Sequence, residues 1–258
     1  MKKFIASVVL FSVLLVGGCG DSNPTGGGGG ENGGGSDFTP GSQFNTKIMY
    51  GFFTDTRGGK NQTYHTVVIN GKTWFAENLN YAGVNGDIGV CYDNKADNCT
   101  KYGRLYNWAE AMDIDSKYNN ELWGGSDIDH QGICPEGWRL ANNADWNNLV
   151  FTAGGDTTRS PDGGTGKLKS KIGWESAWNA VLGQEYSGNG TDDYGFSALP
   201  SGFSTVGLFG NIGYNGYWWS NREINATGAW NRIMRNHHGE VTYSLSDKVD
   251  NFSVRCVQ

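Results

Sequence analysis

The pattern of apolar and polar positions divides the chain into an early mixed part and a late strand-rich part. Residues 64–79 place apolar runs on both sides of Asn70-Gly71, a dipeptide that tolerates the positive φ angles of a two-residue turn, so they predict a β-hairpin. Alternating stretches separated by polar loops predict four later strands, at 217–220, 229–235, 241–245 and 252–257.

Two segments carry apolar residues at helical spacing. The first spans residues 102–115, and its apolar face is Leu105, Trp108, Ala109 and Met112. The second begins at Asn142 or Asn143, either of which can cap it, and Gly154-Gly155 ends it. Its buried stripe is Trp146, Leu149, Val150 and Ala153. The order of elements predicts an α+β fold in which two helices pack on a twisted antiparallel sheet.

The first residues predict export rather than a folded element. Lys2 and Lys3 precede an apolar run too short for a membrane span, so residues 1–18 are interpreted as a signal peptide. The ending at Cys19 resembles a bacterial lipobox, which predicts acylation of that cysteine; ordinary signal cleavage is the alternative. Residues 19–43 are interpreted as a Gly/Ser-rich tether that carries the lipid, and residues 44–258 as one globular domain.

Location and charge narrow the classes of partner. The predicted location is the bacterial outer membrane or cell surface, with contact to the membrane through the lipid anchor only. The chain has a formal net charge of −6, which becomes more negative when Lys2 and Lys3 are removed with the signal peptide. Nucleic acid and anionic lipid are therefore excluded as partners, whereas neutral polymers and cations are not. We expect the globular domain, residues 44–258, called the head below, to be monomeric.

Four cysteines lie outside the signal region, and an even number in an exported chain predicts disulfides. Four cysteines permit three connectivities, but Cys91 and Cys99 flank one small polar loop, which leaves Cys134 to pair with Cys256. A zinc site is the alternative, and the absence of a Cys-x-x-Cys pair disfavours it. The terminal alternation places Phe252, Val254 and Cys256 on one strand face, with Ser253 and Arg255 on the other.

The ordered motifs of the head resemble those of the Fibrobacter succinogenes major paralogous domain, a family of exported bacterial proteins, many with lipoprotein signals. The resemblance runs from about residue 47 to 257 and rests on TWFAENLNY, CYDNKADNC, YGRLYNWAEAM, GICPEGWRLANNADWNNL, GTDDYGFSALPSGF, YWWSN and FSVRCV. Where family members usually read Leu-Pro-Thr before the second helix, this chain has Leu140-Ala141-Asn142. The resemblance implies class and location, not an activity.

A second resemblance concerns the fold. GWRLANNADWNNLVFTAGG and FSVRCV are similar to segments of formylglycine-generating enzymes, and Cys134-Pro135-x-Gly137-Trp138 is similar to the opening of many C-type lectin domains. The resemblance implies a C-type-lectin-like fold that is stapled by disulfides. In such a fold the turn at Cys134, just before the second helix and called here the Cys134 corner, fixes that helix to the last strand.

Catalysis and metal binding find little support in the sequence. The chain has no spare reactive cysteine pair of the kind that formylglycine generation needs, and no Gly-x-Ser-x-Gly elbow. His237-His238 is interpreted as a solvated loop, and Asn189 and Asp192 as turn residues, although they could also ligate calcium. Arg232 stands where sugar-binding C-type lectins require a carboxylate. We therefore predict no enzyme activity and no cofactor, with calcium the one metal left open.

Binding is the leading hypothesis. The candidate ligand-binding residues are Trp230, Arg232, Arg235, His237 and Tyr243. Aromatic faces together with Asn and Arg donors suit a glycan or a protein surface. The alternative is that these aromatics pack the sheet, which is the favoured interpretation for Trp218, Trp219 and Phe252. We consider three hypotheses: a recognition or adhesion module, an exported enzyme acting on polysaccharide or protein, and a structural envelope protein that binds other proteins.

Overall fold

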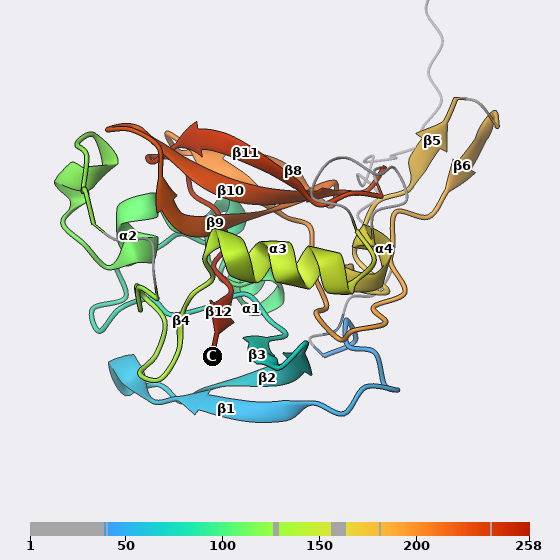
Figure 1. Cartoon of the computed structure of the whole chain (residues 1–258), viewed down its shortest axis with the longest axis horizontal. Helices are drawn as coiled ribbons and strands as arrows, with labels where there is room; N and C mark the ends of the chain where they lie inside the picture. Colours follow the sequence, from blue (N-terminus) through green and yellow to red (C-terminus); the bar gives the residue numbers. More distant parts are fainter. Residues whose placement is uncertain (1–38, 40, 126–128, 156–163, 181, 238) are drawn as a thin grey trace, which may run out of the picture. The chain divides into compact units, whose positions relative to one another are not determined.

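The computed structural model describes residues 39, 41–125, 129–155, 164–180, 182–237 and 239–258 (Figure 1). These residues belong to one compact unit, Gly34–Gln258, and the description that follows concerns this unit alone. The predicted signal peptide, Cys19 and most of the predicted tether lie outside the described residues. None of the helices that the structure describes has the length and apolar character needed to cross a membrane.

The first sheet has five strands, and the last strand of the chain lies inside it. Its order is β1 (Gly51–Asp55), β2 (Gln62–Ile69), β3 (Lys72–Phe75), β12 (Cys256–Val257) and β4 (Arg139–Leu140), with every neighbouring pair antiparallel. The predicted hairpin is confirmed as β2–β3. Asn70 and Gly71 form its turn with φ angles of 50° and 76°, values that a β-branched residue would adopt only under strain.

The second sheet also has five strands, in the order β11 (Thr242–Asp247), β10 (Gly228–Arg235), β9 (Asn215–Glu223), β7 (Ser201–Thr205) and β8 (Leu208–Ile212). The predicted strands at 217–220, 229–235 and 241–245 correspond to β9, β10 and β11. The prediction of a wholly antiparallel late sheet is wrong at one place, because β7 pairs with β9 in parallel. A separate hairpin, β5 (Ala177–Asn179) and β6 (Gln184–Tyr186), projects from the body (Figure 1).

The helices are short, and only one matches its prediction closely. They are α1 (Ala96–Tyr102), α2 (Trp108–Met112), α3 (Asn143–Thr152) and α4 (Thr165–Leu168), with 3₁₀ turns η1 (Arg57–Gly59), η2 (Tyr92–Asn94) and η3 (Ser116–Asn119). In α3, Asn142 is the N-cap of a capping box with Asp145, and the predicted stripe is buried. The described fold is therefore α+β, with more sheet than helix.

The first predicted helix is too long. The structure starts α2 at Trp108 because the residues before it pair with other segments instead. Leu105 forms an isolated bridge with Val90, and Tyr106 forms one with Phe252, so both are held in extended conformation. Apolar spacing alone cannot distinguish a buried extended segment from the first turn of a helix.

Two aromatic clusters lie on opposite faces of the second sheet. Trp218 and Trp219 are adjacent on β9, so their side chains point to opposite faces, and both are fully buried. Trp218 packs with Trp146 of α3, and Trp219 packs with Phe252. The packing interpretation of Trp218, Trp219 and Phe252 is confirmed.

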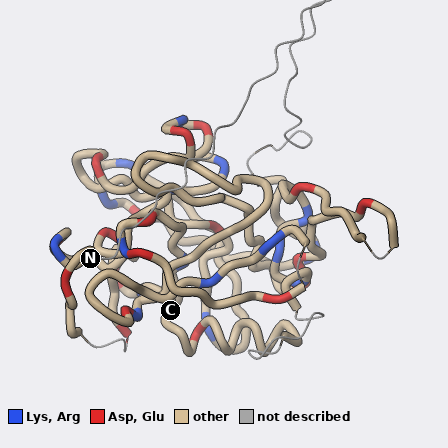
Figure 2. Tube along the Cα trace, turned by 90° about the horizontal axis from the view of Figure 1, so that it is seen from above, with Lys and Arg blue, Asp and Glu red and all other residues tan. Residues whose placement is uncertain are grey.

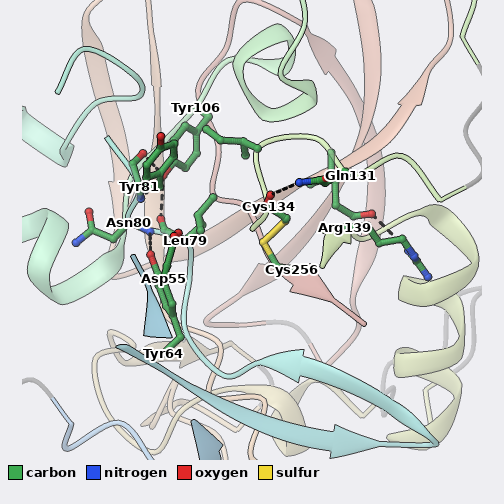
Figure 3. Close-up of a disulfide and its surroundings, with 12 residues drawn as sticks. Asp55, Tyr64, Leu79, Asn80, Tyr81, Tyr106, Gln131, Cys134, Arg139 and Cys256 are labelled. Atoms are coloured by element: carbon green, nitrogen blue, oxygen red, sulfur yellow. Dashed lines mark hydrogen bonds between the residues drawn. A yellow bond between two sulfur atoms is a disulfide. The ribbon is translucent and has the colours of Figure 1, made fainter. Parts of the chain in front are cut away.

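The closing segment, defined as residues 252–257, corrects one prediction and confirms another. Only Cys256–Val257 is a ladder strand, so the strand predicted for 252–257 is too long. Ser253 and Arg255, assigned by alternation to a separate face, are as buried as their neighbours because other segments cover both faces. The disulfide pairing is confirmed: Cys91 is bonded to Cys99, and Cys134 to Cys256 (Figure 3).

Candidate binding surfaces

The first candidate surface is a partly exposed apolar platform, defined as Trp230 on β10 and Tyr243 and Leu245 on β11. The register pairs Trp230 with Leu245 and Arg232 with Tyr243, which places their side chains on one face of the sheet. The Trp230 and Tyr243 rings meet edge to face, with centroids 5.4 Å apart. Tyr243 keeps 57% of its surface exposed and Trp230 is half-buried, so a ligand can reach the pair mainly through the Tyr243 ring.

Arg232 lies next to the platform on the same face of the sheet, and its contacts are with the protein itself. Its side chain is buried, and Nη2 donates to Oδ1 of Asn147, 3.2 Å away, and to the carbonyl oxygen of Asn143. Its guanidinium carbon is 5.8 Å from the centre of the Tyr243 ring. Burial lowers the pKa of Arg232 to about 10, so it stays cationic at neutral pH. Arg232 therefore connects the platform to α3.

The other two predicted ligand residues lie elsewhere, so the predicted set of five is not one surface. Arg235 is three residues beyond Arg232 on the same strand, which turns its side chain to the opposite face. Its Nη1 donates to Oγ1 of Thr242. His237 follows β10, and its carbonyl oxygen accepts a hydrogen bond from the hydroxyl of Tyr186 on β6. His238 lies outside the described residues.

The turn interpretation of Asn189 and Asp192 agrees with their contacts. The two side-chain oxygens of Asp192 accept hydrogen bonds from the backbone and hydroxyl of Ser197, each 2.7 Å long. Oδ1 of Asn189 accepts from the backbone of Trp174. Within the described ranges, no three His, Cys, Asp or Glu side chains are grouped so that they could hold a metal ion. The four cysteines of the head are disulfide-bonded and so cannot ligate zinc.

A second surface, which sequence reasoning missed, is a cavity of about 390 Å³ beside the first sheet. One wall is β1, η1 and β2, another is the loop 80–86, and the third is the disulfide loop of Cys91 and Cys99. Figure 3 shows Asp55, Tyr64 and Asn80, three of its lining residues, close together. The polar lining residues are Asp55, Arg57, Lys60, Gln62, Tyr64, Asn80, Tyr81, Asn85 and Arg104.

Part of the cavity wall is rigid because its polar groups bond one another. The guanidinium of Arg57 donates through Nε and Nη2 to the buried carboxylate of Asp55, and through Nη1 to the carbonyl oxygens of Ile133 and Cys134. The same guanidinium covers the ring of Tyr81, 4.1 Å from its centre. Because this pair ties β1 to the Cys134 corner, it holds the wall in place.

Comparison with models of known protein families shows which family the chain belongs to. The family model described as the Fibrobacter succinogenes major domain matches residues 67–258, well over half of the chain. The chain belongs to the Fibrobacter succinogenes major domain family. It has no significant match among curated proteins or among solved structures.

The family match covers the two candidate surfaces unequally. In this Fibrobacter succinogenes major domain, the platform, the closing segment and both disulfides lie inside the matched region. Asp55 and Arg57, which form the rigid wall of the cavity, precede residue 67 and lie outside it. The signals that could have indicated the cavity are the glycines of the loop 80–86 and the cluster of Arg57 and Lys60 before the hairpin, neither of which forms a known motif.

Proposed function

We propose that the head is a non-catalytic recognition module, tethered to the bacterial surface through an acylated Cys19, and that its platform binds polysaccharide. The observation that carries the proposal is the edge-to-face pair of half-buried Trp230 and exposed Tyr243 on the second sheet. Aromatic rings supply stiff apolar area to a sugar face at little cost in conformational entropy. Arg232, which is hydrogen-bonded to α3, packs beside the Tyr243 ring on the same face, so the platform is preorganised.

Two further observations support the proposal. A C-type-lectin-like arrangement is in keeping with a helix packed on a sheet and with the bridge from Cys134, ahead of α3, to the last strand. A non-catalytic role is in keeping with the cavity lining: among the described residues that line it, Asp55 is the sole carboxylate, and Arg57 engages both of its oxygens. Glycoside hydrolysis ordinarily needs two carboxyl groups facing each other across the bond.

The test is retention on polysaccharide. The oxidised head is incubated with insoluble cellulose and with an array of neutral plant-wall and cell-surface glycans, and bound protein is measured. We expect Tyr243→Ala and Trp230→Ala to weaken binding about tenfold each, since each loses a stacking ring. Tyr214→Ala is the matched control, because Tyr214 is exposed to a similar extent, 51%, but lies outside the platform.

Three results would overturn the proposal. They are the absence of retention on any glycan at any salt concentration, an equal loss in the Tyr214→Ala control, and release of shortened sugars during incubation. The last would instead favour an exported enzyme. Retention of a protein partner through Tyr243 in crosslinking on intact cells, without glycan retention, would favour a structural envelope protein.

A further inference from the structure

The polar groups that line the cavity fall into two sets. Asp55 and Arg57 satisfy each other, as described above. The second set is uncommitted: the side chains of Lys60, Asn80 and Asn85 make no hydrogen bond or ion pair with any part of the chain that the structure describes. In Figure 3 the amide of Asn80 points away from the disulfide and from Leu79. Polar groups gathered in a concave site without protein partners are those that a ligand can satisfy.

Arg104 is fixed in position yet retains hydrogen-bonding capacity. Its Nη1 donates to the carbonyl oxygens of Ile88 and Gly89, at 3.2 and 2.9 Å. Its Nε is buried without a partner, and Nη2 has no hydrogen bond to any described residue. A guanidinium held by two backbone carbonyls loses little rotational freedom when a ligand binds its remaining nitrogen. Among the polar side chains of the cavity, Arg104 is therefore the one best preorganised to bind a ligand.

The charge of the lining favours an anion. Arg57, Lys60 and Arg104 contribute positive charge, and Asp55, the one carboxylate among the described lining residues, is paired with Arg57. Outside the cavity, burial raises the pKa of the Glu110 carboxyl group, and the positive charge of Arg104 acts in the opposite direction. The Glu110 carboxylate makes no ion pair with Arg104 and instead accepts a hydrogen bond from the backbone of Asn107, in the capping box of α2. Acidic and basic positions are interspersed along the chain (Figure 2), whereas Lys60 and Arg104 line one cavity and form no ion pair with a described residue.

We propose that this cavity binds one carboxylate-bearing sugar unit, a uronate, through Arg104 and Lys60, with Asn80 and Asn85 bonding its hydroxyl groups. Arg and Lys recognise carboxylates by charge-assisted hydrogen bonds, whereas side-chain amides donate to and accept from hydroxyls. A volume of about 390 Å³ is within the range of small-ligand sites. The inference rests on the proposed function only for the sugar nature of the ligand, because the cavity lies beside the first sheet and the platform lies on the second.

The test is calorimetric titration of the whole oxidised head with galacturonate, galactose and acetate. Galactose has the same ring without the carboxylate, and acetate has the carboxylate without the ring. We expect galacturonate to bind at least about tenfold more tightly than either, and Arg104→Gln to raise its Kd about tenfold or more. Lys60→Gln changes an exposed side chain, and we expect a Kd about threefold higher. Lys171→Gln, an exposed lysine outside the cavity, should leave the Kd unchanged.

The outcomes separate this inference from the proposed function. Equal affinity for galacturonate and galactose, no binding of either, or unchanged affinity in Arg104→Gln would overturn the inference while leaving cellulose retention through the platform unaffected. Acetate binding as tightly as galacturonate would refute a sugar ligand. Binding of polygalacturonate alone would refute a single-unit site. If Arg104→Gln fails to unfold cooperatively, the Kd of Lys60→Gln decides.

Discussion

Asn78 and Asn80 are two residues apart, yet their side chains belong to different regions of the molecule. The amide of Asn78 is buried and makes four hydrogen bonds: its oxygen accepts from Trp218 and Arg255, and its nitrogen donates to Tyr102 and Ser253. The amide of Asn80 lines the cavity and bonds none of the described residues. Asn78 thus bonds Ser253 and Arg255 of the closing segment, whereas Asn80 faces the solvent in the cavity.

The difference extends to the arginines of the two regions. Arg255 is fully buried, and its donors bond Asn78 and the carbonyl oxygens of Phe75, Phe196 and Ser197. Arg104 leaves Nη2 unused among the described residues. A buried polar group without a partner costs stability, so full satisfaction marks a structural network. Unsatisfied groups around a cavity instead indicate capacity for a ligand.

The largest effect should come from the bridge that holds the closing segment. Cys134 and Cys256 are 122 residues apart, whereas Cys91 and Cys99, beside the cavity, are eight apart. On the chain-entropy model, removing the long-range bridge as Cys134→Ala/Cys256→Ala costs about 5 kcal/mol of unfolding free energy, and Cys91→Ala/Cys99→Ala costs about half as much. Urea denaturation of the two double variants measures both. Equal losses would contradict the prediction that the long-range bridge stabilises the fold more than the local one.

The two asparagines test the comparison directly. Asn78→Ala should lower the free energy of unfolding by about 3 kcal/mol, because it leaves the guanidinium of Arg255 and other buried groups without partners. Asn80→Ala, the matched control in the cavity, should stay within about 0.5 kcal/mol of the native chain. Urea midpoints of both variants give the answer. A large loss in Asn80→Ala would mean that the cavity amides are structural.

The sequence predicted the local parts of this fold well. The start of α3 follows from Asn142 and Asp145, and the turn of β2–β3 follows from Asn70-Gly71, since these signals act over a few residues. Longer-range effects were missed. Apolar spacing predicts a helix at Leu105, because the bridge from Leu105 to Val90 has no local signature. Arg255 was placed on a separate face because alternation reveals two faces but does not show that both are covered.

The candidate surfaces were only partly predictable for the same reason. Trp230 and Tyr243 were named from residue type and strand position, and the strand register does bring them together. Arg235 was grouped with them although strand parity turns it away. The cavity draws its lining from residues 55 to 104, on two strands, a 3₁₀ turn, helix α1 and the loops between these elements. Only the folded chain shows that Lys60, Asn80 and Arg104 share one site.

The smallest predicted effect concerns Asp192, a buried acid whose carboxylate is fully hydrogen-bonded within the fold. Burial raises the pKa of Asp192 to about 6 from 3.8, even though hydrogen bonds from Ser197 and the charge of Arg255 act in the opposite direction. Between pH 4 and 6 the native state therefore holds a proton that the unfolded chain has lost. The resulting stability is fully present below pH 3.8 and is lost as pH rises through 6. Between pH 4 and 6 we expect the native chain to lose about 2 kcal/mol from this source.

The measurement is the free energy of unfolding as a function of pH for the native chain and Asp192→Asn. An amide can keep the hydrogen bonds to Ser197, because that hydroxyl can donate or accept, but it cannot titrate. The variant should therefore lose less stability than the native chain as pH rises from 4 to 6. Asp193→Asn, which changes the exposed neighbouring carboxylate, is the control. Parallel curves for the native chain and Asp192→Asn would mean that the hydrogen bonds offset the effect of burial on the pKa of Asp192 completely. The buried polar network would then accommodate the charged carboxylate as well as the neutral one.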